Sequence, residues 1–110
     1  MDTGNIIVAS EVGVSIASFD DVGNLIGTCF GASGILLTES ELAPQFFDLK
    51  TGLAGDLLQK VTNYRLRTAI LIKDARAYGP RFAELVLEHQ SSRVVRFFHD
   101  RLDADTWLRE

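Results

Sequence analysis

The sequence predicts a single small α/β domain over residues 1–110, with a mainly parallel or mixed sheet of four to five strands and about four helices. Short β-branched runs alternate with amphipathic helical stripes from residue 18 onward, an order typical of parallel strands joined by right-handed crossovers. A length of 110 residues suits one domain with one core. A hydrophobic content of 46% is ample for a packed interior.

The first third of the chain predicts two short strands and a helix. Residues 5–9 contain the β-branched run Ile-Ile-Val, and residues 12–16 alternate as a second strand, spaced for a hairpin with the first. Ser18 begins a helix, because Ser18 and Asp21 have the spacing of a capping box. The apolar stripe of this helix is Val22, Leu25, Ile26 and Cys29.

The middle of the chain predicts a buried strand and a long amphipathic helix. Residues 35–38 form an apolar run typical of a strand that is buried on both faces. A polar connecting segment follows at residues 39–44, and a helix is predicted over residues 51–64. Two alternatives stay open before this helix. Either one helix runs unbroken from Pro44, or the chain breaks near Asp48.

The last third of the chain predicts two further strands and two helices. Residues 66–72 form a central strand, and Pro80 is the first residue of the helix that follows a loop. Residues 94–98 form the last strand. Asp103 begins a short terminal helix that carries Trp107. We expect Trp107 to cover the sheet edge or a subunit contact, which makes a homodimer one open prediction.

Charge and composition exclude several classes of partner. The net charge is −4 and the pI is near 5.1, which argues against binding to nucleic acid or to an anionic membrane surface. No basic segment precedes an apolar stretch, and no apolar run reaches about 20 residues, so we expect a cytoplasmic protein without a membrane partner. Cys29 lies in an apolar run and predicts a buried, inert thiol.

The sequence carries no motif for catalysis or for a cofactor. It contains no glycine-rich nucleotide loop, no nucleophile elbow and no C-x-x-C pair, so we assign no catalytic residue and no cofactor. His89 and His99 lack partners at metal-ligand spacing, so no metal site is predicted. An enzyme is therefore the less favoured class.

The most informative segment is Phe46-Phe47-Asp48-Leu49-Lys50-Thr51-Gly52-Leu53-Ala54-Gly55. It sets Asp48, Lys50 and Thr51 beside Gly52 and Gly55. Glycine inside a helix costs about 1 kcal/mol relative to alanine, so a neighbouring strand or a partner is expected to approach the backbone here. A hydroxyl at a helix N-terminus suits an anion or a phosphate. The alternative is that Thr51 simply caps the helix.

A second polar cluster lies at the end of the same predicted helix. Its members are Gln59, Lys60, Asn63, Tyr64 and Arg65. We count Asn63 and Arg65 among the candidate residues for binding a partner or an anion. The alternative is a solvated helix side that ends at Asn63, with Arg65 complementing the helix dipole.

The two segments together resemble a bacterial family of small proteins classified as a domain of unknown function. The resemblance rests on residues 46–55, on Leu58-Gln59-Lys60 and on Asn63-Tyr64-Arg65, and it covers roughly residues 5–108. Membership in that family implies no activity.

The order of elements is also distantly similar to that of the STAS domain of anti-sigma-factor antagonists. That family carries Asp-Ser-Ser-Gly-Leu at the start of the helix after its central strand, and the serine before the glycine is phosphorylated. Asp48, Thr51, Gly52 and Leu53 take those places here, but Leu49 and Lys50 stand where the family has one serine.

This likeness implies a non-enzymatic module that binds a protein partner, with Thr51 as the phosphorylation site. The alternative is a small ligand-binding protein or enzyme with a polar pocket near Asp48, Lys50, Asn63 and Arg65.

Overall fold

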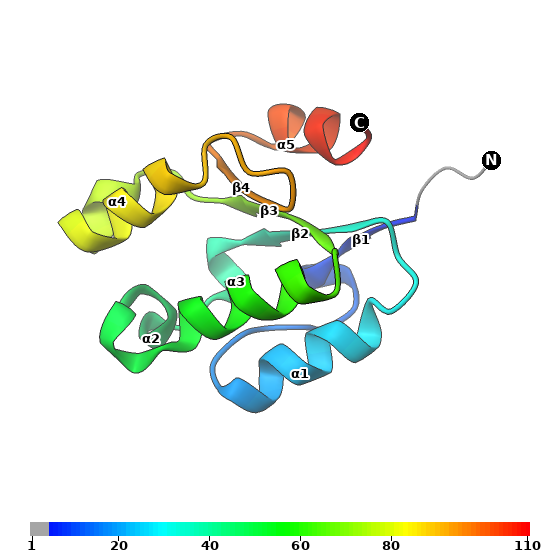
Figure 1. Cartoon of the computed structure of the whole chain (residues 1–110), viewed down its shortest axis with the longest axis horizontal. Coiled ribbons are helices and arrows are strands. Elements are labelled where there is room, and N and C mark those ends of the chain that lie inside the picture. Colours follow the sequence, from blue (N-terminus) through cyan, green and yellow to red (C-terminus); the bar gives the residue numbers. More distant parts are fainter. Residues whose placement is uncertain (1–4) are drawn as a thin grey trace.

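The computed structural model describes residues 5–110, which form one four-stranded parallel sheet (Figure 1). The strands are β1 (Ile6–Val8), β2 (Gly34–Thr38), β3 (Arg67–Leu71) and β4 (Val95–Phe98), and they lie in the order β1-β2-β3-β4. The α-helices are α1 (Phe19–Thr28), α2 (Pro44–Phe47), α3 (Leu53–Asn63), α4 (Pro80–Glu88) and α5 (Arg101–Leu108). The predicted α/β class is confirmed, with every strand parallel to its neighbours.

The predicted second strand at residues 12–16, and the hairpin that it would form, are wrong. Ile16 alone bridges to Leu42, and its amide N–H donates to the carbonyl oxygen of Glu41 at 2.6 Å. Upstream, Gly13 takes a left-handed φ of 72°, which bends the chain away from an extended path. The period-2 alternation of this segment therefore reflects a turn held by one bridge, and β1 pairs with β2 instead.

The sheet separates two unequal apolar layers. Alternate residues of the strands, such as Ile35, Leu37 and Ile70, face a large core against α1, α3 and Phe82 of α4. The intervening residues face α5 alone, and Figure 1 shows α5 lying on the opposite side of the sheet from α1 and α3. The predicted burial of β2 on both faces is confirmed, since residues 34–37 are all buried.

Trp107 belongs to the smaller layer and covers the face of the sheet. Its side chain is 4% exposed and packs beneath Arg67, whose guanidinium carbon lies 4.2 Å from the centre of the indole ring. Gly34 allows α5 to pack closely on the sheet, because a Cβ there would lie 3.0 Å from Cδ2 of Leu108. Trp107 therefore covers the face of the sheet over β3 and the edge strand β4, its own side chain is buried within the chain, and the homodimer stays a prediction.

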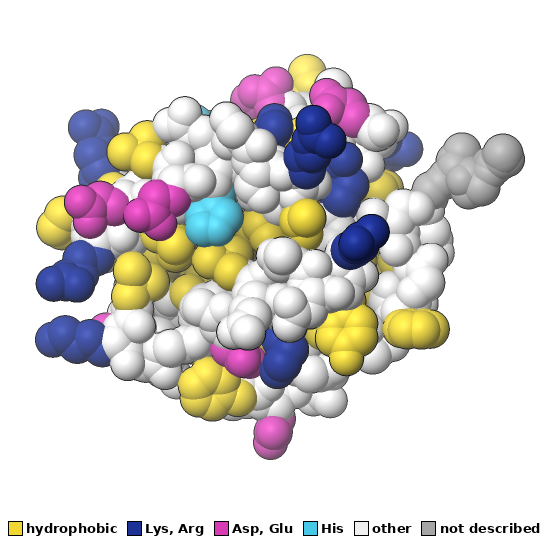
Figure 2. Space-filling view, viewed as in Figure 1, with side chains coloured by type: hydrophobic (Ala, Val, Ile, Leu, Met, Phe, Trp, Pro, Cys, Tyr) yellow, Lys and Arg dark blue, Asp and Glu magenta, His cyan; other side chains and the backbone are white. Residues whose placement is uncertain are grey.

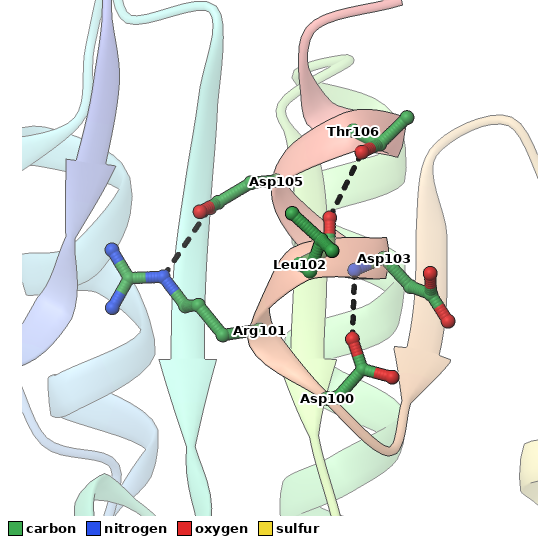
Figure 3. Close-up of polar contacts among 6 residues, drawn as sticks. All are labelled: Asp100, Arg101, Leu102, Asp103, Asp105 and Thr106. Atoms are coloured by element: carbon green, nitrogen blue, oxygen red, sulfur yellow. Dashed lines mark hydrogen bonds and ion pairs between the residues drawn. The ribbon is translucent and has the colours of Figure 1, made fainter.

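Caps place the first and last helices. The capping box predicted for α1 is confirmed, since the amide N–H of Asp21 donates to Oγ of Ser18 and the amide N–H of Ser18 donates to the Asp21 carboxylate. Helix α5 begins earlier than predicted because its cap is Asp100, whose carboxylate accepts the Asp103 amide N–H at 2.9 Å (Figure 3).

The helix between Pro44 and Asn63 is interrupted, which decides between the two alternatives left open by the sequence. Helix α2 ends at Phe47, and Asp48 is extended with a φ of −91° and a ψ of 100°. A short 3-10 turn, η3 (Leu49–Thr51), then leads to Gly52, whose left-handed φ of 79° redirects the chain into α3. Within residues 5–110, none of the helices has the length and apolar character needed to cross a membrane.

Candidate functional site

The carboxyl ends of the strands open onto a cleft of about 650 Å³. One wall comes from α2 and η3, and the other comes from the 3-10 turn η4 (Ala75–Tyr78) and the start of α4. The cleft is open to solvent, and in Figure 1 α2 and the start of α4 lie at the same end of the molecule. The lining residues are Pro44, Phe47, Asp48, Leu49 and Lys50 on one side, and Tyr78, Gly79, Pro80, Arg81 and Phe82 on the other.

Aromatic rings join the two walls of the cleft. Phe47 and Tyr78 are stacked, with ring centres 3.7 Å apart and planes 9° from parallel. Phe82 meets both rings edge to face, at 5.1 Å from Phe47 and 5.7 Å from Tyr78. Phe82 is only 1% exposed, whereas the other two rings are half-buried and present apolar surface to the cleft.

Glu39 fixes the second wall from the end of β2. One carboxylate oxygen accepts the amide N–H of Lys73 at 2.9 Å, and the other accepts the hydroxyl of Tyr78. One carboxylate thus ties the chain after β2 to the loop after β3. The hydrogen bond to Glu39, with burial and the negative charge of Glu39, raises the pKa of Tyr78 to about 12. Tyr78 therefore stays a neutral donor that holds its ring against Phe47.

Asp48 and Lys50 line the first wall of the cleft, where the sequence placed a binding site. Both side chains are exposed. The Asp48 carboxylate accepts the amide N–H of Lys50 at 3.2 Å, which caps the turn η3. The two residues are therefore held close together at the rim.

Thr51 is exposed, but its hydroxyl already has partners within the chain. Oγ1 lies 2.8 Å from the carbonyl oxygen of Gln45 and 2.9 Å from that of Asp48, and it accepts the amide N–H of Leu53 at 3.2 Å. The predicted helix start at Thr51 is wrong, because Thr51 ends η3 and Gly52 caps α3. Phosphorylation of Thr51 stays a prediction, and a phosphate would remove the only hydroxyl proton that these carbonyls share.

The two glycines of the segment are explained without a neighbouring strand. Gly52 is needed for its positive φ, and a Cβ there would come no closer than 3.8 Å to the Phe19 ring. At Gly55 a Cβ would have nothing within 4 Å outside its own helix backbone. The neighbouring-strand explanation is therefore wrong, and the approach of a partner to Gly52 and Gly55 stays a prediction.

Asn63 and Arg65 lie at the opposite end of α3 from the cleft. The 11 residues of α3 make a helix about 16 Å long. Arg65 takes a left-handed φ of 54° and its amide N–H donates to the carbonyl oxygen of Thr62 at 3.1 Å, so it ends the helix. The predicted shared pocket of Asp48, Lys50, Asn63 and Arg65 is therefore wrong, because only the first two line the cleft.

The isolated cysteine and histidines form no reactive or metal-binding cluster in the described part of the chain. Cys29 is 1% exposed, as the sequence predicted, and burial raises the pKa of its thiol. Residues 5–110 contain no group of three His, Cys, Asp or Glu side chains that could hold a metal ion.

The sequence patterns gave no indication of the second wall, which includes Tyr78 and Arg81, or of Glu39. Residues 73–79 read only as a loop, and they lie about 30 positions from Asp48. One signal was available, since Pro44 and Pro80 each begin a helix that follows a predicted strand. Both helices had to start at the same edge of a parallel sheet.

Residues 1–108 match the model of the family described as "Domain of unknown function (DUF4180)". The chain belongs to this family. The match covers nearly the whole chain and confirms membership of a domain of unknown function, whereas the part of the resemblance that rests on the block at residues 46–65 stays a prediction. No curated protein and no solved structure matches the chain, so the likeness to STAS domains is not confirmed.

Proposed function

We propose that this protein is a binding module that holds a small ligand in the cleft between α2 and α4. The observation that carries the proposal is the cleft itself, whose volume of about 650 Å³ lies within the range of small-molecule sites. Its apolar floor is formed by Phe47 and Tyr78, with a few charged groups at the rim. Such a lining buries a ring and orients a polar group, which is what ligand recognition requires.

The wall that bears Tyr78 is held in place before any ligand arrives. Glu39 bonds both the Tyr78 hydroxyl and the Lys73 amide, and both bonds come from a single carboxylate at the end of β2. A preformed wall reduces the ordering cost that binding must overcome. This arrangement favours a ligand site over an adaptable surface that forms only with its partner.

A protein partner controlled by phosphorylation of Thr51 is the weaker candidate. That model needs a hydroxyl free to exchange partners, whereas Thr51 already bonds backbone groups of Gln45, Asp48 and Leu53. A pull-down with Thr51→Glu beside the wild type tests it, and identical partners in both samples would rule the switch out.

Binding of the neutral fluorescent amine N-phenyl-1-naphthylamine tests the ligand site. We expect the wild type to bind this dye, and Phe47→Ala and Leu49→Gln to weaken binding, because both substitutions remove apolar surface from one wall. Phe30→Ala is the matched control, since it deletes the same kind of ring at the opposite edge of the sheet. Circular dichroism confirms that each variant is folded. Equal affinity in Phe47→Ala, Leu49→Gln and Phe30→Ala would contradict the proposal.

A further inference from the structure

The net charge of the residues that line the cleft is opposite in sign to the net charge of the whole chain. The protein carries a net charge of −4, yet the charged residues of the cleft are Lys50, Arg81 and the single carboxylate of Asp48. Figure 2 shows basic side chains, with acidic ones beside them, projecting from the end of the molecule that carries α2 and the start of α4. The cleft is therefore a local positive site on an acidic protein.

Lys50 and Arg81 stand on opposite walls and are available to a ligand. Lys50 comes from η3 and Arg81 from the first turn of α4, and both side chains are exposed. The ion pairs within residues 5–110 involve other cations, namely Lys60, Arg76 and Arg101. Two cations that face one cleft from both sides suit an anionic group placed between them.

The start of α4 adds to the same field. Its cap is Gly79, which has no side chain to bond the first-turn amides, and Gly79, Pro80, Arg81 and Phe82 all line the cleft. The positive end of the helix dipole therefore points to the wall that bears Arg81.

We propose that the ligand of this cleft carries an anionic group, a carboxylate, sulfonate or phosphate, attached to a flat apolar ring. The ring lies against Phe47 and Tyr78, and the anion lies between Lys50 and Arg81. This inference rests on the proposed function and adds to it the chemical class of the ligand. Asp48 sets a limit on affinity, because its carboxylate repels the anion from the same wall that bears Lys50.

Two dyes with the same ring system test the inference. The first is 8-anilinonaphthalene-1-sulfonate, and the second is N-phenyl-1-naphthylamine, which lacks only the sulfonate. We expect the wild type to bind the sulfonate more tightly than the neutral amine. Lys50→Ala and Arg81→Ala should each raise the Kd for the sulfonate about three- to fivefold, and should raise the Kd for the neutral amine by a smaller factor, because each also removes part of the aliphatic lining of the cleft.

Two further variants control for charge and for the carboxylate. Arg93→Ala removes an exposed cation from the loop before β4, at the opposite edge of the sheet, and should leave both Kd values unchanged. Asp48→Asn keeps an oxygen that accepts the Lys50 amide but removes the negative charge. It should lower the Kd for the sulfonate about two- to threefold.

The outcomes separate this inference from the proposed function. If the neutral amine binds but Lys50→Ala and Arg81→Ala change sulfonate binding no more than Arg93→Ala does, the anionic class is wrong and the cleft remains a ligand site. If neither dye binds the wild type, the proposed function fails and the inference fails with it.

Discussion

One alternative from the sequence placed the two ends of helix α3 in a single pocket, but their surroundings in the structure are different. The amino end adjoins the cleft, where aromatic rings from α2, η4 and α4 meet under a rim of opposite charges. The carboxyl end carries Asn63 and Arg65, which end the helix and do not line the cleft. A hollow at this end measures about 90 Å³ and is lined by residues such as Phe30 and Tyr64.

This difference shows at which edge of a parallel α/β sheet the residues of a binding site come together. At the carboxyl edge, loops after two strands converge, and Glu39 joins them. At the amino edge, the chain returns from each helix to the next strand through a short turn, such as residues 64–66 between α3 and β3. Residues on one face of a helix are therefore neighbours only when they lie within a turn or two of each other.

The largest expected contrast is between two phenylalanines, one at each edge. Phe82→Ala should lower the free energy of unfolding by about 3–5 kcal/mol, because Phe82 is 1% exposed and contacts Phe46, Phe47, Tyr78 and Phe97. Phe30→Ala should change it by less than about 0.5 kcal/mol, since Phe30 is 82% exposed. Urea unfolding of both variants measures the contrast, and similar losses would break it.

A smaller loss is expected from Gly34→Ala at the amino edge. The new Cβ would lie 3.0 Å from Leu108 Cδ2 and 3.1 Å from the carbonyl oxygen of Arg67, which is backbone and cannot easily move. Overpacking of this kind costs about 1–3 kcal/mol. Thermal unfolding should show a lower midpoint, and an unchanged midpoint would mean that α5 packs more loosely than described.

The hydrogen bond between Tyr78 and Glu39 makes stability at the carboxyl edge depend on alkaline pH. The pKa of Tyr78 is raised in the folded protein to about 12, from an ordinary value of 10.0. Its stabilising effect is therefore fully present below pH 10 and is lost as the pH rises towards 12. Urea unfolding over this range should show a loss on the order of 1–2 kcal/mol. Tyr78→Phe should lack this part of the pH dependence, and identical profiles would contradict the assignment.

The smallest effect concerns Gly55, at the amino end of α3. The position is exposed and a Cβ would meet nothing within 4 Å outside its own helix backbone, so Gly55→Ala should stabilise the protein by about 1 kcal/mol. A higher unfolding midpoint with unchanged dye binding is expected. Weaker dye binding in this variant would instead support the prediction that a partner approaches the backbone at Gly55.

Local patterns were enough to predict most elements of the fold. The capping box at Ser18, the apolar run of β2 and the proline that begins α4 each depend on neighbouring residues, and each is confirmed. The alternation at residues 12–16 misled because a turn held by one bridge can show the same period as a strand. The start of α5 was predicted too late in the chain because Asp100 and Asp103 both suit a helix start.

The candidate site was predicted only in part, for a physical reason. Asp48 and Lys50 stood out because a charged pair beside glycines is unusual before a helix. Tyr78, Arg81 and Glu39 carry no local signal, since their role depends on the contacts that bring the segments after β2 and β3 together at one edge. A helical pattern also does not indicate distance along the axis, which is why Asn63 and Arg65 were placed in one pocket with Asp48 and Lys50.

The most direct test of the account is a map of amide chemical shifts in the ¹⁵N-labelled protein as 8-anilinonaphthalene-1-sulfonate is added. The account predicts that the largest changes fall on residues 44–50 and 78–82, with none at residues 63–65. Changes centred on residues 63–65, or on the exposed side of α5 around Leu102, would place binding elsewhere and contradict it.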